Sequence, residues 1–273
     1  MLELRILTAV VLIPILVAVT LKGSSQLFAG LLGVFILLAA FEWTALAGYR
    51  HRFTRIVYPA VIFLLLTGLY TVLDSTWVVP LLLFTTGCWC IAFVLVILYQ
   101  SGHWTFICPG GIKLALGLLL LVPPWLGLVL LHSHFNGPVL ILFLFVLIWA
   151  ADSGAYFTGR SWGRRHLASR ISPGKTWEGV AGGLLVSLLV AVLYTQLVGA
   201  IDIDIVWLAL LSIITVIFSV VGDLVESIFK RHAHIKDSGS LLPGHGGVLD
   251  RIDSLTAAVP VFTGGLGLIG GQL

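Results

Sequence analysis

The sequence predicts an all-α, polytopic integral membrane protein with about nine transmembrane helices and a cytoplasmic N-terminus. The first observation behind this prediction is composition: 59% of the 273 residues are hydrophobic and only 10% are charged, whereas soluble domains carry about 25% charged residues. The second is a mean hydropathy of +1.11. The third is a series of apolar runs near the ~20 residues that a helix needs to cross a bilayer. So few charges cannot build a water-facing surface, and the bilayer must be the main solvent.

The apolar runs give nine candidate transmembrane helices. The first could be a signal peptide, but Glu3 dilutes its positive charge and no A-x-A-like cleavage site follows, so we expect it to be retained. The fifth contains Pro123 and Pro124, which predict a kink. The expected spans are 5–21, 26–48, 57–73, 77–99, 114–131, 138–157, 179–199, 205–229 and 254–271.

The distribution of positive charge sets the predicted orientation. Alternate loops of nine helices lie on opposite sides, and all of the 15 Lys and Arg residues except Lys22 then fall on one side. Because loops rich in Lys and Arg stay in the cytoplasm, we expect a bacterial cytoplasmic (inner) membrane protein with its polar loops 158–178 and 230–253 facing the cytoplasm. These loops and helices 6–9 form a predicted catalytic region, 136–273. Helices 1–5, in 1–135, form a predicted lipid-facing scaffold.

Four acidic residues are expected near the inner edge of the membrane. Asp223 lies about 18 residues, or ~27 Å, beyond Ile205 in the eighth helix, and Glu226 lies one turn further. By the same arithmetic Asp152 lies ~21 Å and Glu42 ~24 Å along their helices. Ionisable groups at such depths usually mark function, and this is the favoured interpretation for Asp223. For Glu42 an interfacial acid that caps or pairs with a loop Arg is an equal alternative.

The stretch from Ser227 to Asp253 begins with a cluster of positive charge. Three Lys or Arg residues lie near the end of the eighth helix, and polyphosphate is a natural counter-charge for them. Gly244, Gly246 and Gly247 allow backbone N–H groups to approach an anion closely. We therefore interpret this part as a phosphate-binding site. The basic residues are Lys230, Arg231 and Lys236.

Two acids close the same stretch and point to a metal ion. Asp250 and Asp253 share a face if the ninth helix begins there, and such hard oxygen ligands suit Mg²⁺, which binds through carboxylates and substrate phosphates. A surface loop that holds lipid headgroups would explain the basic residues but not the acids and glycines. A zinc site is a weaker alternative, because the stretch has no Cys and many acids lie nearby. Its ligands would be His232, His234 and His245.

A second polar loop, 158–178, follows the sixth helix. Its later part comes near a P-loop pattern, but the first glycine is missing, Pro173 removes a backbone N–H and no strand is expected before it, so we reject a P-loop. We expect Lys175 to meet phosphate just before the seventh helix, whose N-terminus favours anions. Glu178 would cap that helix. Two further basic residues, which either attract an anionic headgroup or only fix topology, are Arg164 and Arg165.

The stretch from Ser227 to Asp253 resembles the signature of the phosphatidate cytidylyltransferase family, also called CDP-diacylglycerol synthases. Its pattern, without departure from that signature, is S-x-x-K-R-x4-K-D-x-G-x2-L-P-x-H-G-G-x2-D-R-x-D. Gly222–Ser227 and Ser172–Gly179 also resemble family segments. The resemblance is good over about residues 140–260, whereas the first hundred residues are similar only in being apolar. It implies a Mg²⁺-dependent nucleotidyltransferase of phospholipid synthesis that acts on CTP and phosphatidic acid at the lipid bilayer.

The reaction implied by the resemblance is nucleotidyl transfer. The phosphate of phosphatidic acid attacks the α-phosphorus of CTP, CDP-diacylglycerol forms and pyrophosphate leaves. Because the nucleophile is already an anion, the protein has to position two anions and neutralise the leaving group. Two metal ions can clamp the attacking and leaving oxygens, so we expect Mg²⁺ with two metal positions, the identity of the second ion being open.

The resemblance and the charges together give candidate residues for each role. The candidate catalytic residues are Asp223, Asp250, Lys236 and Arg251. The candidate Mg²⁺ ligands are Asp223 and Asp250, with Asp253 or Glu226 as a further ligand. The candidate substrate-binding residues are Lys175, Lys230, Arg231, Ser227, His245, Gly246, Gly247, Arg164 and Arg165.

Three alternative functions carry different expectations. A CTP-dependent polyprenol or lipid kinase would release CDP instead of pyrophosphate. A membrane transporter with an intramembrane acidic relay would place its acids near mid-membrane and show two repeats with interrupted helices, which the sequence lacks. An enzyme that consumes CDP-diacylglycerol would carry a D-G-x2-A-R type motif, which is also lacking. A homodimer suits a helix-rich membrane enzyme of this size, although no motif indicates one, and no nucleic-acid partner is expected.

Overall fold

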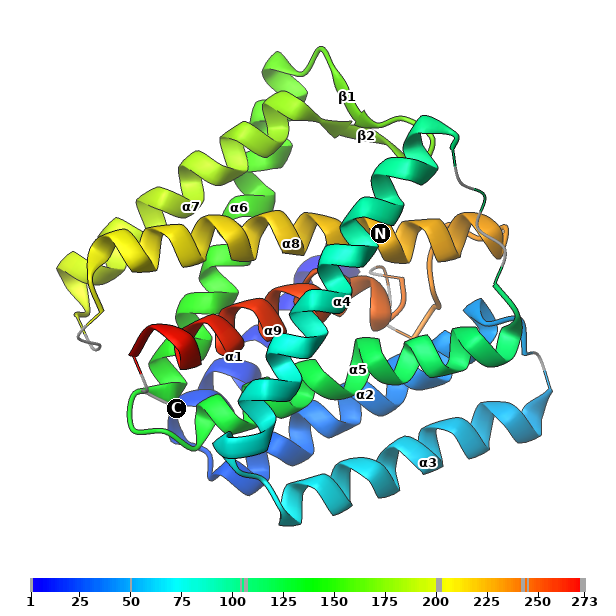
Figure 1. The fold of residues 1–273 in the computed structure, drawn as a ribbon, viewed down its shortest axis with the longest axis horizontal. Coiled ribbons are helices and arrows are strands. Elements are labelled where there is room, and N and C mark those ends of the chain that lie inside the picture. Colours follow the sequence, from blue (N-terminus) through cyan, green and yellow to red (C-terminus); the bar gives the residue numbers. More distant parts are fainter. Residues whose placement is uncertain are drawn as a thin grey trace.

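The computed structural model describes residues 2–49, 51–103, 105, 108–199, 203–241, 244 and 246–270. Within these residues the chain forms nine helices and one short β-hairpin (Figure 1). Eight of these described helices are long and apolar enough to cross a membrane, and the first contributes the shorter apolar stretch Val10–Lys22. The prediction of an all-α polytopic membrane protein is therefore confirmed.

The elements follow the order of the apolar runs along the chain. Large apolar side chains such as Leu64, Phe84 and Ile91 are exposed on the third and fourth helices, as expected for a surface that contacts a membrane. The helices are α1 (Leu2–Lys22), α2 (Ser25–Leu46), α3 (Arg52–Thr71), α4 (Ser75–Ser101), α5 (Gly110–His132), α6 (Gly137–Trp162), α7 (Trp177–Leu197), α8 (Ile205–His232) and α9 (Leu249–Gly270). The strands are β1 (His166–Ala168) and β2 (Ser172–Thr176).

The ninth helix begins at Leu249, earlier than the expected residue 254. The expectation counted only apolar residues, whereas α9 begins with charged residues: Asp250 lies in its first turn and Asp253 follows three positions later. The N–H groups at the start of a helix lack intrahelical partners. At the start of α9 the carboxylate of Glu42 accepts hydrogen bonds from two such groups, those of Val248 and Leu249. The earlier start puts Asp250 and Asp253 on one helix face, as the sequence suggested.

The loop after α6 contains two strands that the sequence analysis did not predict. β1 and β2 have three and five residues and pair antiparallel, and strands this short show no alternating pattern. β2 carries Lys175 and ends at Thr176, whose Oγ1 accepts a hydrogen bond from the N–H of Gly179 at 3.1 Å and caps α7. Glu178 lies in the first turn of α7, where its carboxylate accepts from its own backbone N–H, as expected for a residue that caps the helix start. It also accepts from the backbone N–H of Arg165 at 3.2 Å.

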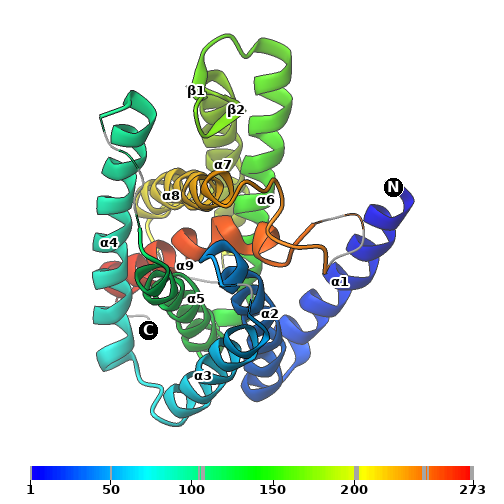
Figure 2. The same ribbon diagram turned by 90° about the vertical axis from the view of Figure 1, so that its right-hand side faces the viewer.

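Helix α9 lies in the middle of the bundle and packs against α2, α4, α5 and α8 (Figure 2). Helix α8 approaches it closely because residue 222 is Gly: a Cβ on Gly222 would lie 2.6 Å from the backbone oxygen of Asp253. This close packing brings the acidic face of α8, with Asp223 and Glu226, against the first turn of α9.

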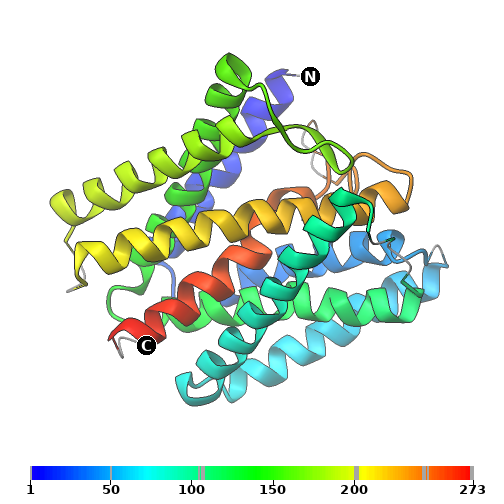
Figure 3. The same cartoon turned by 45° about the horizontal axis from the view of Figure 1, so that its top comes forward.

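The β-hairpin lies beside the C-terminal end of α8, where the segment 233–248 leads to α9 (Figure 3). Arg231 at that end of α8 donates from Nε to the backbone oxygen of Ile171 in the hairpin at 3.2 Å. The two polar segments singled out in the sequence therefore lie together. Helix α1, by contrast, lies at the edge of the bundle, where it packs against α2 and α6 (Figure 2).

Candidate active site

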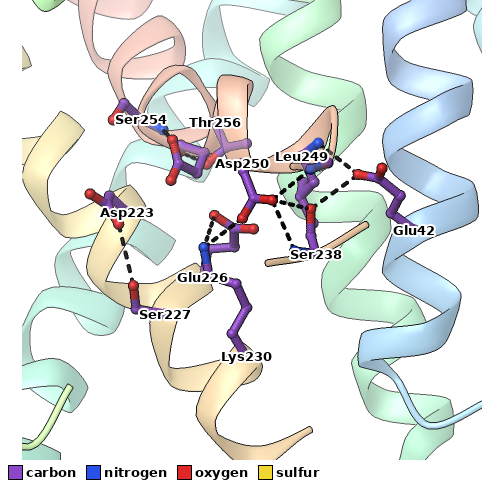
Figure 4. A network of polar contacts seen from close by, with 12 residues as sticks. Glu42, Asp223, Glu226, Ser227, Lys230, Ser238, Leu249, Asp250, Ser254 and Thr256 are labelled. Carbon is purple, nitrogen blue, oxygen red and sulfur yellow. Dashed lines mark hydrogen bonds and ion pairs between the residues drawn. The ribbon is translucent and has the colours of Figure 1, made fainter. Parts of the chain in front are cut away.

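A buried lysine links the two helices at the centre of the site (Figure 4). Lys230 Nζ lies 2.7 Å from Asp250 Oδ1 on α9 and 3.2 Å from Glu226 Oε2, one turn before it on α8. The side chains of Lys230, Glu226 and Asp250 are only 12%, 5% and 7% exposed. Charges buried to this degree are stable only when they are paired and hydrogen-bonded, so these three residues form one structural unit.

The second oxygen of Asp250 is held by three donors. Asp250 Oδ2 accepts from the N–H of Gly247 at 2.8 Å, from the N–H of Ser238 at 2.9 Å and from Ser238 Oγ at 3.0 Å. With Lys230 on the other oxygen, the carboxylate is fixed in one orientation. Such preorganisation is what a catalytic or metal-binding carboxylate requires.

Glu42 of α2 joins this network from the N-terminal part of the chain (Figure 4). It is 3% exposed, and its carboxylate accepts from the N–H groups of Val248 at 3.1 Å and Leu249 at 2.9 Å. Ser238 Oγ lies 3.1 Å from Glu42 Oε2 as well as 3.0 Å from Asp250 Oδ2, so its one proton serves either carboxylate. A negative charge is favourable at a helix N-terminus. Glu42 therefore caps the start of α9, and among the described residues no Arg is paired with it.

The glycines of the segment before α9 pack tightly around these carboxylates. A Cβ on Gly239 would collide with Glu42, and a Cβ on Gly247 would collide with Ser238 Oγ. Gly246 has a φ of +82°, a left-handed conformation that favours glycine. The sequence suggested that Gly244, Gly246 and Gly247 approach a substrate anion, and the anion that the N–H of Gly247 contacts here is the protein's own Asp250.

A second ion pair joins the hairpin to α8. Lys175 Nζ on β2 lies 2.6 Å from Asp223 Oδ2, with side chains 27% and 31% exposed. Ser227 Oγ, one turn along α8, donates to Asp223 Oδ1 at 3.3 Å (Figure 4). Asp152 of α6 is close enough to interact electrostatically with both Lys175 and Asp223. Both polar loops thus contribute to one cluster of charge, and this pair is more accessible than the Lys230 unit.

The other candidate residues lie around this cluster. Arg231 is engaged with the hairpin backbone, while Lys236 and Arg251 are exposed. Arg164 and Arg165 are exposed just before β1. The candidate His245 lies outside the described residues.

The cluster contains oxygen atoms suited to a hard cation. Glu226 Oε1 is buried, and the Asp253 carboxylate lies within hydrogen-bonding reach of the Glu226 carboxylate. Among the described residues, no three His, Cys, Asp or Glu side chains meet at metal-binding spacing. The ammonium groups of Lys175 and Lys230 lie against the carboxylates instead. The donor chemistry fits Mg²⁺, which prefers carboxylate oxygens and keeps several waters.

Ser238 was not assigned a role from the sequence, and for Glu42 a functional and an interfacial role were left as equal alternatives. Ser238 falls inside the signature stretch but at a variable position of its pattern. Glu42 is separated from Ser238 by 196 positions. Its depth in the second helix, in the same membrane layer as Asp223, was the only signal that could have linked it to the site.

The sequence profile of the cytidylyltransferase family matches residues 3–266 of the chain. A phosphatidate cytidylyltransferase of Pseudomonas aeruginosa is 46% identical over 267 residues, which cover 96% of each chain. A phosphatidate cytidylyltransferase of Haemophilus influenzae is 41% identical over 283 residues, or 96% of this chain and 98% of that one. One of Brucella suis is 38% identical over 265 residues, or 94% and 90% of the two chains.

Proposed function

Because this chain belongs to the cytidylyltransferase family, we propose that it transfers the cytidylyl group of CTP to phosphatidic acid. The products are CDP-diacylglycerol, a precursor in phospholipid synthesis, and pyrophosphate. The observation that carries the proposal is the pair of lysine–carboxylate units, Lys230 with Asp250 and Glu226 and Lys175 with Asp223, gathered where α8 and α9 pack together. Lys230 and Asp250 lie in the signature stretch, and Lys175, Asp223 and Glu226 lie in the two further segments that resemble the family. Their side chains suit the chemistry of two phosphorylated substrates.

The protein groups serve mainly to bring two anions together. The phosphate of phosphatidic acid already carries the negative charge that attacks the α-phosphorus of CTP, so no side chain has to remove a proton from it. Lys175 and Lys230 bind phosphate oxygens and offset the repulsion between the substrates, and their long, flexible stems allow the ammonium groups to reach them. Arg231 holds the hairpin that carries Lys175. The proposed phosphate contacts at the periphery are Ser227, Lys236, Arg251, Arg164 and Arg165.

We propose Mg²⁺ as the cofactor, with two metal positions. Its ligands would be Asp223 and Asp250, with Asp253 or Glu226 as a further ligand, and the close approach of the buried Glu226 and Asp253 carboxylates supports this assignment. When bound, the ions neutralise charge on the attacking and leaving phosphate oxygens. The hydrogen bonds from Ser238 and Gly247 keep Asp250 in place for this role.

The proposed location is the bacterial cytoplasmic membrane, with the site facing the cytoplasm. The excess of Lys and Arg on the side of the two polar loops supports this orientation. CTP is soluble and phosphatidic acid is a lipid, so a site at the edge of the bilayer admits each from its own phase. A homodimer is the proposed assembly, which chemical crosslinking of the membrane-embedded protein tests.

Removal of divalent cations is expected to abolish the activity. Treatment with EDTA should lower product formation at least about a hundredfold, since metal ions supply several kcal/mol of transition-state stabilisation, and adding Mg²⁺ should restore it. The measurement is the rate of CDP-diacylglycerol formation, with circular dichroism as the control that the helices stay folded. Undiminished turnover in EDTA would contradict the assignment of a metal cofactor.

The product analysis separates the proposed function from its alternatives. Purified protein is incubated with radiolabelled CTP, Mg²⁺ and phosphatidic acid, and the expected result is label in the lipid phase together with pyrophosphate in water. Release of CDP with a phosphorylated lipid would establish a kinase instead. If neither product forms with a folded protein, the proposed function is wrong.

A further inference from the structure

A cavity of about 280 Å³ lies beside the site, between α1, α2, α5, α6 and α9. Its walls are almost entirely apolar, and Arg251 is the one charged residue among those described residues that line it. Its volume is near the lower end of the ~300–1,000 Å³ typical of small-molecule pockets. The cavity therefore suits a slender apolar group. Representative lining residues are Leu16, Phe35, Trp125, Trp149 and Leu255.

The charged rim of the cavity adjoins the carboxylate network. Arg251 directly follows Asp250 on α9, so their Cα atoms are about 3.8 Å apart, and successive helical residues point about 100° apart around the axis. Asp250 faces Lys230, while Arg251 lines the cavity together with Val248 and Ile252. The first turn of α9 thus forms the boundary between the polar site and the apolar cavity.

The outer wall of the cavity is a peripheral helix. Leu12, Ile13 and Leu16 of α1 line it, and α1 lies at the edge of the bundle (Figure 2). Helix α1 is therefore the part of the cavity wall that lies toward the surrounding bilayer, away from the packed helices at the centre.

We propose that this cavity holds one acyl chain of the phosphatidic acid substrate, while Arg251 at its rim binds the headgroup phosphate. The proposal rests on the proposed function and adds to it the binding site of the lipid. Arginine suits a phosphate because its planar group donates two parallel hydrogen bonds, and apolar walls suit a hydrocarbon chain. With the phosphate on Arg251, the nucleophilic oxygen lies next to the Asp250 and Lys230 unit. The second acyl chain stays in the bilayer.

Filling the cavity tests the proposal through substrate chain length. Leu16→Trp places a larger side chain in the cavity, and Ile15→Trp, on the exposed side of the same helix, is the matched control. With dioleoyl phosphatidic acid, kcat/KM of Leu16→Trp is expected to fall about tenfold or more, in line with pocket discrimination by size. With water-soluble dihexanoyl phosphatidic acid the fall is expected to be within about twofold, and the KM for CTP should stay unchanged. Ile15→Trp should match the wild type on both lipids.

Crosslinking gives a readout that does not depend on turnover. Phosphatidic acid with a diazirine near the end of one acyl chain is expected to label the wild-type protein on cavity residues such as Leu16, Leu128 and Leu255, and to lose this labelling in Leu16→Trp. Equal losses of activity on both chain lengths, or labelling confined to the outer surfaces of α3 and α4, would overturn the proposal. If the wild type makes no labelled lipid from either substrate, the proposed function itself fails, whatever the variants do.

Discussion

Asp250→Asn is expected to lower kcat at least about a hundredfold while the protein still inserts and folds. Both oxygens of Asp250 accept hydrogen bonds, one from Lys230 and the other from Ser238 and Gly247. An asparagine offers one oxygen and turns an N–H₂ group toward donors, so either Lys230 or the loop loses its partner. It also removes a negative ligand from the proposed metal site. Losses of this size, about a hundred- to a thousandfold, follow the removal of one preorganised electrostatic group.

The matched control for this variant is Asp204→Asn at the opposite end of α8. Asp204 caps that helix by accepting from the N–H of Val206 at 2.7 Å, and asparagine caps a helix about as well as aspartate. The Asp204→Asn variant should therefore keep the wild-type kcat. Both variants are to be compared with the wild type in membrane yield, detergent size-exclusion profile and initial rate. Wild-type kcat in purified Asp250→Asn would rule out a catalytic or metal-binding role for this residue.

Glu42→Gln is expected to weaken both the fold and the activity, although Glu42 is outside the signature stretch. Its carboxylate accepts from two N–H groups at the start of α9 and from Ser238, and the amide of glutamine can offer only one oxygen to them. Hydrogen bonds to a charged group contribute about 1.5–3 kcal/mol, so the thermal midpoint should fall by about 5 °C. Because Glu42 positions the helix that carries Asp250, kcat should fall about ten- to a hundredfold, as for partners of metal ligands.

A positioning role can be distinguished from general destabilisation by the metal requirement. In Glu42→Gln the Mg²⁺ concentration for half-maximal rate should rise about tenfold when measured well below the melting temperature. Glu178→Gln is the control, because Glu178 accepts a hydrogen bond from the exposed loop before β1. In this variant the Mg²⁺ concentration for half-maximal rate should stay within about twofold of the wild-type value. An unchanged Mg²⁺ requirement in Glu42→Gln would leave Glu42 with a structural role only.

The fold was largely predictable because the membrane imposes a simple rule on sequence. Runs of about twenty apolar residues have to be helices, and these runs give the helices and their order. The start of α9 was missed because its first turn contains charged residues, and hydropathy does not show that Glu42 accepts from the N–H groups of Val248 and Leu249. The hairpin was missed because β1 and β2 are shorter than any pattern that indicates a strand.

The site was predictable in its members but not in its pairing. The signature stretch identified Lys230 and Asp250 from their residue types and spacing. It suggested phosphate as the partner of Lys230, whereas in the structure Lys230 lies against Asp250 and Glu226. Local sequence shows the sign of each charge, but which opposite charge lies nearest depends on how α8 and α9 pack. Glu42 illustrates the same limit, since its partners lie about two hundred positions away along the chain.

The link between Glu42 and α9 has a consequence for how the protein is made. The partners Val248 and Leu249 follow Glu42 by 206 and 207 positions, so at about 5–20 residues per second the ribosome needs about 10–40 s to supply them. During that interval the second helix enters the bilayer with an acid whose stabilising donors have not yet been synthesised. Chains that stop before the last helix lack the N–H groups of Val248 and Leu249, so in them Glu42 has none of these donors.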